Sequence, residues 1–97
     1  MLKISVKDDE QHILLDVEGR LAGPWVSELE QCWQDQRRRS PEKTLSVRLR
    51  AVSFIDDGGK ELLSRMVADG AKLEGNGCLV RAIVAKIIGA FQPDTVR

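Results

Sequence analysis

Two short segments near the amino terminus alternate apolar and polar residues, and this pattern constrains the fold more than any other feature of the chain. Leu2–Lys7 alternates with a period of two, and His12–Glu18 has apolar residues at its odd-numbered positions. Because successive side chains of a strand point to opposite faces, both segments predict strands with one buried face. The polar stretch Asp8–Gln11 predicts a hairpin turn, and Gly19 and Gly23 are expected to end the second strand.

The rest of the chain alternates helical spacing with strand-like spacing. The elements predicted after the hairpin are a helix over Pro24–Arg39, a strand over Leu45–Leu49 that leads through 51–55, a helix over Gly58–Asp69, a strand over Ala71–Glu74 and a helix over Cys78–Ala90. The order β-β-α-β-α-β-α predicts an α/β fold, with helices packed on at least one face of a mixed sheet. A length of 97 residues leaves room for a single domain over 1–97.

Charge balance and reactive residues argue against several classes of function. The chain has 15 basic and 15 acidic residues, so it lacks the net field that would attract nucleic acid or an anionic membrane. Cys32, Cys78 and His12 match no metal spacing, and no catalytic triad, phosphate-binding loop or dinucleotide motif is present. We therefore expect a non-enzymatic protein without metal or cofactor. The sequence has no apolar signal core or membrane-spanning stretch, so we expect a cytoplasmic location without membrane insertion.

The most informative motif is the run Asp56-Asp57-Gly58-Gly59-Lys60. Two adjacent carboxylates can bind a divalent cation or share a proton. The structural alternative is that one aspartate caps the second helix while the other accepts backbone hydrogen bonds in the turn. The two glycines would leave backbone N–H groups uncovered at the positive end of that helix, where a carboxylate or carbonyl of a partner can bind. Capping and partner docking are compatible.

Three segments form an ordered series: Leu14–Leu21, then Leu45–Leu49 with Val52–Asp56, then Asp56–Gly59 followed by Leu62-Leu63. Together they resemble the STAS family, to which the anti-sigma-factor antagonists belong. The first segment resembles the family's second strand, the next resembles the strand that delivers the signature loop, and the last resembles the signature, usually Asp-Ser-Ser/Thr-Gly before an apolar helix. The resemblance covers most of Met1–Glu74.

The resemblance implies a STAS-like mixed sheet in a small bacterial regulatory module that binds another protein. In phosphorylation-controlled members a Ser or Thr before the signature glycine accepts the phosphate; Gly58 holds that place here, so phosphorylation is not expected to switch this chain. The implied partner is an anti-sigma factor, a signalling complex or a transporter component. The residues expected to bind it are Asp56, Asp57, Gly58, Gly59 and Lys60, with Gly23 and Trp25 at the rim.

Two alternatives stay open beside this interpretation. One is a structural STAS subunit of a larger complex, such as a transporter assembly. The other is that Asp57 imitates the negative charge of a phosphorylated state.

The third predicted helix is unusually apolar. Its apolar residues form two adjacent stripes that span roughly 180° of the helix surface, whereas a helix that packs on a sheet needs a stripe of about 100°. The surplus predicts an oligomer face, a homodimer or a stable hetero-complex, through Val80, Val84, Ile88 and Phe91. The alternative is that a small core with few aromatic residues takes both stripes. Only Gln92–Arg97 follow, so the resemblance implies a short variant of the family fold.

Overall fold

The computed structural model describes the backbone of residues 2–75 and 78–91 and the side chains of residues 2–75 and 82–89. The elements in these residues are β1 (Leu2–Asp8), β2 (His12–Leu21), α1 (Pro24–Arg39), β3 (Thr44–Ile55), α2 (Asp57–Ala68), β4 (Lys72–Gly75) and α3 (Cys78–Phe91). This α/β order confirms the one expected from the sequence.

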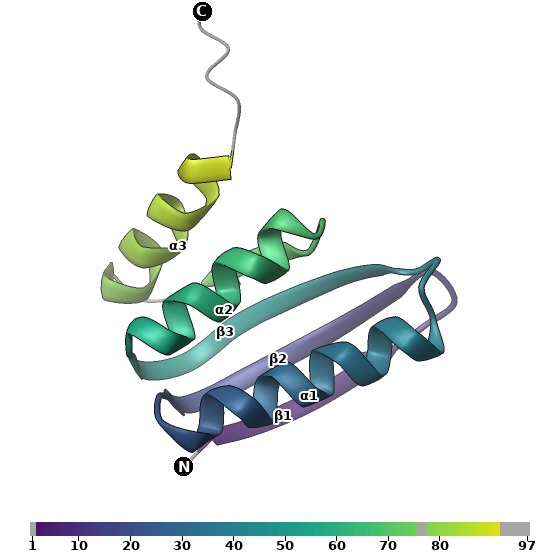
Figure 1. Cartoon of the computed structure of the whole chain (residues 1–97), viewed down its shortest axis with the longest axis horizontal. Coiled ribbons are helices and arrows are strands. Elements are labelled where there is room, and N and C mark those ends of the chain that lie inside the picture. The colour runs from purple at the N-terminus through teal and green to yellow at the C-terminus, as the bar shows by residue number, and fades with distance from the viewer. Residues whose placement is uncertain (1, 76–77, 92–97) are drawn as a thin grey trace, which may run out of the picture.

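The strands form one mixed sheet in the order β1-β2-β3-β4. The hairpin of β1 and β2 is antiparallel, whereas β2 with β3 and β3 with β4 are parallel. In Figure 1, α1 and α2 lie over the strands and α3 lies beside α2. The core fills the space between these helices and the sheet, and its members with no exposed side chain are Leu15, Val17, Leu21, Leu29, Leu49, Leu62 and Leu63.

The second strand is longer than its glycines indicate. Gly19 was expected to break it, but β2 continues to Leu21, and Gly19 pairs with Val52 of β3. Gly19 has a φ of 107°, a backbone conformation that residues with a Cβ rarely adopt. The β2–β3 register shifts on both sides of this residue, so the glycine marks an irregularity inside the strand and the backbone ladder continues past it.

The third helix contributes to the core of the described chain. Val84 and Ile87 are each 7% exposed, and Ile83 and Ile88 pack against the same cluster. Val84 was expected on an oligomer face; that placement is wrong, because the side chain is already buried between the helix and the rest of the domain. The side chains of Val80 and Phe91 lie outside the described residues.

The two tryptophans of α1 have different environments. Trp33 is 4% exposed and belongs to the core, whereas Trp25, in the first turn of the helix, is half-buried.

Among the helices that the structure describes, none has the length and apolar character needed to cross a bilayer.

Candidate functional site

Two helices begin side by side at one end of the sheet. The parallel strands β2 and β3 are paired up to Leu21 and Ile55, where both end. Because the strands run in the same direction, α1 starts at Pro24 and α2 at Asp57 beyond the same edge of the sheet (Figure 1). In open α/β sheets, ligands bind beyond the carboxyl ends of the strands. This edge is therefore the candidate site.

The side chain of Asp56 joins the two helix starts. Its Oδ1 accepts a hydrogen bond of 2.7 Å from the backbone N–H of Gly59, which makes it the N-cap of α2. Its Oδ2 accepts a bond of 2.9 Å from the backbone N–H of Gly23, the residue before α1. The backbone N–H of Asp56 itself donates to the carbonyl of Leu21 at 3.1 Å. The capping role expected from the sequence is confirmed, and one carboxylate serves both the cap and the neighbouring loop.

These contacts determine the charge state of the residue. The hydrogen bond from Gly23, followed by the one from Gly59, lowers the pKa of the Asp56 carboxyl below its ordinary value. The carboxylate is thus ionised at neutral pH. Its charge faces the positive ends of two helix dipoles, an arrangement that favours the negative form.

Gly58 and Gly59 are neighbours with different structural roles. A Cβ on Gly59 would lie 2.7 Å from the carbonyl oxygen of Leu21 and 2.9 Å from Cγ2 of Ile55, so only glycine fits between α2 and the end of β2. A Cβ on Gly58 would lie 3.5 Å from Oδ1 of Asp56, which is an ordinary contact. Gly59 therefore serves close packing, and its N–H is taken by Asp56. This corrects the expectation that both glycines offer N–H groups to a partner.

The exposed part of this edge comes from both helix starts. Gly23, Asp57, Gly58 and Lys60 are exposed and Trp25 is half-buried; we call these five residues the helix-start surface. A Cβ at Gly58 would lie 4.0 Å from Cγ2 of Val26, so the first turns of α2 and α1 are in near contact. The structure therefore joins Gly23 and Gly59 through Asp56 and places Gly58 near α1, whereas Lys60 lies on the side of α2 that faces α3.

No metal-binding cluster accompanies this surface in the described residues. Within them, no group of three His, Cys, Asp or Glu side chains converges as a metal site would require. The Asp56 carboxylate accepts hydrogen bonds from two backbone donors, and because these lower its pKa they make it a weaker base.

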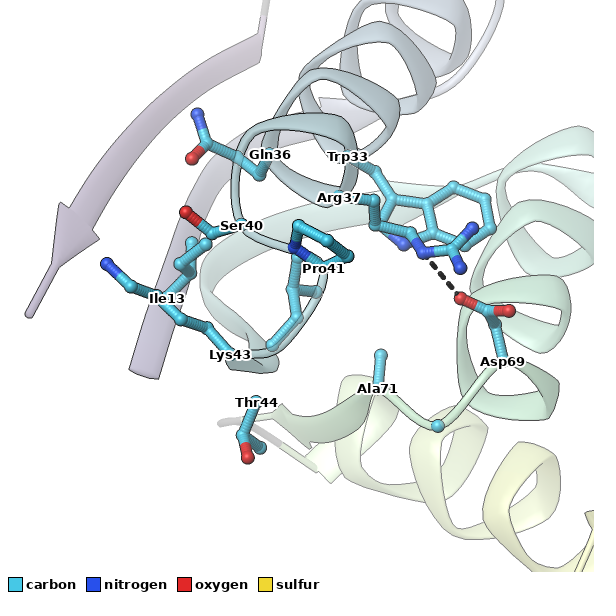
Figure 2. A pocket seen from close by; sticks show the side chains of 12 residues that line it. Ile13, Trp33, Gln36, Arg37, Ser40, Pro41, Lys43, Thr44, Asp69 and Ala71 are labelled. Carbon is cyan, nitrogen blue, oxygen red and sulfur yellow. Dashed lines mark ion pairs between the residues drawn. The ribbon is translucent and has the colours of Figure 1, made fainter. Parts of the chain in front are cut away.

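A separate hollow of about 170 Å³ lies where α1 and α2 end (Figure 2). Its lining includes Trp33, Pro41 and Ala71, and one side is formed by an ion pair of 2.8 Å between Nε of Arg37 and Oδ2 of Asp69. The guanidinium of Arg37 also lies 5.8 Å from the centre of the Trp33 ring. The two charges neutralise each other, and the ion pair links the last turn of α1 to the residue that follows α2. We therefore assign this hollow a structural role.

Comparisons with known proteins support the fold. Neither family models nor curated proteins match this chain. Among solved structures, it resembles one described as "Crystal Structure Analysis of Mglu", with a TM-score of 0.59 and 23% sequence identity. The match covers 76% of this chain and 19% of that one, so the likeness concerns a small part of the other protein. At this identity it shows a shared fold.

The two glycines provide a matched pair of substitutions. Gly59→Ala should destabilise the domain by roughly 1–3 kcal/mol, because the methyl group would clash with the Leu21 carbonyl and Ile55. Gly58→Ala has room for its methyl group and should leave stability within about 1 kcal/mol of the wild type. Chemical denaturation of both variants measures the difference. Equal stability of the two would contradict the close packing of Gly59.

The lowered pKa of Asp56 predicts a dependence of stability on pH. A carboxyl group whose folded pKa is depressed stabilises the fold above its unfolded pKa, about 3.9 for aspartate, and that contribution is lost as the pH falls through the folded value. Asp56→Asn removes this titration and the acceptor for Gly23, so the variant should be less stable at neutral pH and should lose less stability on acidification.

Urea denaturation at neutral pH and at acidic pH measures this difference. Asp9 has a pKa lowered by hydrogen bonds from the backbone of Gln11 and His12, and it titrates in both proteins. The contribution of Asp56 is therefore the difference between the two profiles. If the stability of both proteins falls in parallel with pH, Asp56 does not contribute to the pH dependence.

Proposed function

We propose that the chain is a STAS-type protein-binding module that docks its partner on the helix-start surface. The observation that carries the proposal is the bridge made by Asp56, which holds the starts of α1 and α2 together and leaves Gly58 exposed between them. A surface fixed in this way is preorganised, so a partner does not have to order its loops on binding. The α/β order and the sequence resemblance of Asp56–Gly59 to the STAS signature support the same proposal.

The helix-start surface combines several chemical features. Lys60 supplies a cation, Asp57 an anion, and the half-buried Trp25 an aromatic side chain of the kind favoured at binding hot spots. Gly58 supplies a flat area where a partner can approach the backbone. Because Gly58 holds the place of the phosphoacceptor and lacks a hydroxyl, binding is governed by the concentration of the partner. The proposed partner is a cytoplasmic anti-sigma factor, signalling complex or transporter component.

A structural subunit is the second candidate, and a groove between α2 and α3 favours it. The groove has a volume of about 420 Å³ and is lined by Ala82, Ile83 and Ile87, with Lys60, Ser64 and Lys86 around them. An apolar groove of this size is large enough to take a side chain of a neighbouring subunit. In this case the partner would cover α3 and Lys60, which belongs to both the groove and the helix-start surface, and Gly23, Trp25 and Gly58 would be dispensable.

The experiment that tests the proposal uses two exposed helix glycines that both leave space for a side chain. Gly58→Trp places a bulky group on the helix-start surface, and Gly89→Trp places the same group on α3, where no atom lies within 4 Å of a Cβ. Each tagged protein is used to capture partners from the cytosol of its source organism, and mass spectrometry quantifies what is bound. Circular dichroism confirms that the variants are folded.

We expect Gly89→Trp to retain the partner of the wild type and Gly58→Trp to lose it, because a tryptophan at residue 58 prevents close approach to both helix starts. Retention of the partner by Gly58→Trp would refute docking at this surface. Loss with Gly89→Trp alone would favour the structural subunit.

A further inference from the structure

The second face of the sheet is not covered by any of the helices that the structure describes. The buried positions of β2 and β3 point toward the helices, so the alternate residues form an open face. This face has a surplus of positive charge in a chain whose formal net charge is zero. Its charged residues in the described strands are the cations Lys3, Lys7, Arg20, Arg48, Arg50 and Lys72 and the anions Asp16, Glu18 and Glu74.

Two irregularities in β3 shape one part of this open face. The register with β2 passes from Leu49 to Ala51 and from Val52 to Phe54, so Arg50 and Ser53 have no partner residue in β2. Bulges are rare in parallel pairs, and they redirect side chains. The irregularity at Arg50 lets this side chain reach Asp16, and the irregularity at Ser53 places Phe54 opposite Arg20.

Arg20 and Phe54 form an exposed pair. The guanidinium carbon of Arg20 lies 4.8 Å from the centre of the Phe54 ring, within the range of a cation–π interaction. Phe54 is nevertheless 42% exposed, which is high for a large apolar side chain. Arginine and aromatic residues are enriched where proteins bind each other.

On the same face of the sheet, four residues before Arg20 in β2, lies a buried carboxylate with an unused acceptor. Asp16 is 2% exposed, and its Oδ2 lies 3.4 Å from a guanidinium nitrogen of Arg50 and 3.8 Å from Nζ of Lys7. Its Oδ1 is buried without a hydrogen-bond donor. A buried acceptor without a partner is uncommon in folded proteins. One anion thus positions two cations, and a positive charge remains in excess at the surface.

We propose that the open face binds an acidic segment of a partner protein, centred on Arg20, Arg50 and Phe54. Carboxylates of the segment pair with the arginines and with Lys7, and an apolar side chain packs on Phe54. Nucleic acid fits less well, because Arg20 occupies a face of the ring on which a base would stack, and the chain as a whole has no net charge.

The test uses a short synthetic peptide in which glutamates flank a single tryptophan, titrated into the full chain and followed by two-dimensional NMR. We expect shift changes on the open face, weakened by salt and absent with the matched peptide that contains glutamine in place of glutamate. Arg20→Glu and Phe54→Ala should each weaken binding by about tenfold, whereas Arg39→Glu, the same charge change at the end of α1, should leave it unchanged.

Three outcomes would overturn the proposal. The first is the absence of shift changes on the open face. The second is equal weakening by Arg39→Glu and Arg20→Glu, which would indicate unspecific charge attraction. The third is tighter binding of oligothymidylate than of the acidic peptide, which would assign the face to nucleic acid. These readouts do not depend on the helix-start surface, so either proposal can fail alone.

Discussion

The carboxylate of Asp56 is the group on which the arrangement of the helix starts depends, because its two oxygens accept hydrogen bonds from different loops. Gly59 belongs to the first turn of α2, and Gly23 ends the loop that precedes α1. The backbone N–H of Asp56 also donates to Leu21, the last residue of β2. One residue therefore fixes where two helices begin relative to the end of β2. The helix-start surface is therefore held in place by the same hydrogen bonds.

The layered arrangement explains why the two proposed interaction surfaces are separate. All three described helices contribute to a core on one face of the sheet, and the carboxyl edge of the parallel strands presents α1 and α2 together. The other face keeps the polar half of each alternating strand. A neutral chain can therefore carry a local surplus of cations, because its acidic residues are distributed elsewhere. The two proposals use different sides of the molecule and different chemistry.

Local sequence patterns were sufficient to predict the order of elements and the cap. Alternation in β1 and β2, Pro24 at the start of α1 and the pair of aspartates before Gly58 each act within a few residues, so they can be recognised without a structure.

Features that depend on tertiary contacts could not be predicted in this way. The bond from Gly23 to Asp56 joins residues 33 positions apart, and no local pattern predicts it, although the family resemblance placed both residues at one expected site. The irregularities at Arg50 and Ser53 arise from pairing with β2, so no local pattern signals them. Val84 was assigned to an oligomer face because helical periodicity reveals an apolar stripe but not which part of it the core covers.

The most direct test of the account is an NMR titration of the amide protons of Gly23 and Gly59 through the acidic range. If Asp56 holds both loops, the two amide protons should shift with one shared pKa that matches the carboxyl carbon of Asp56 and lies below the ordinary aspartate value. If the Gly23 amide does not follow the titration of Asp56, the bridge between the two helix starts is absent, and the account of this surface is wrong.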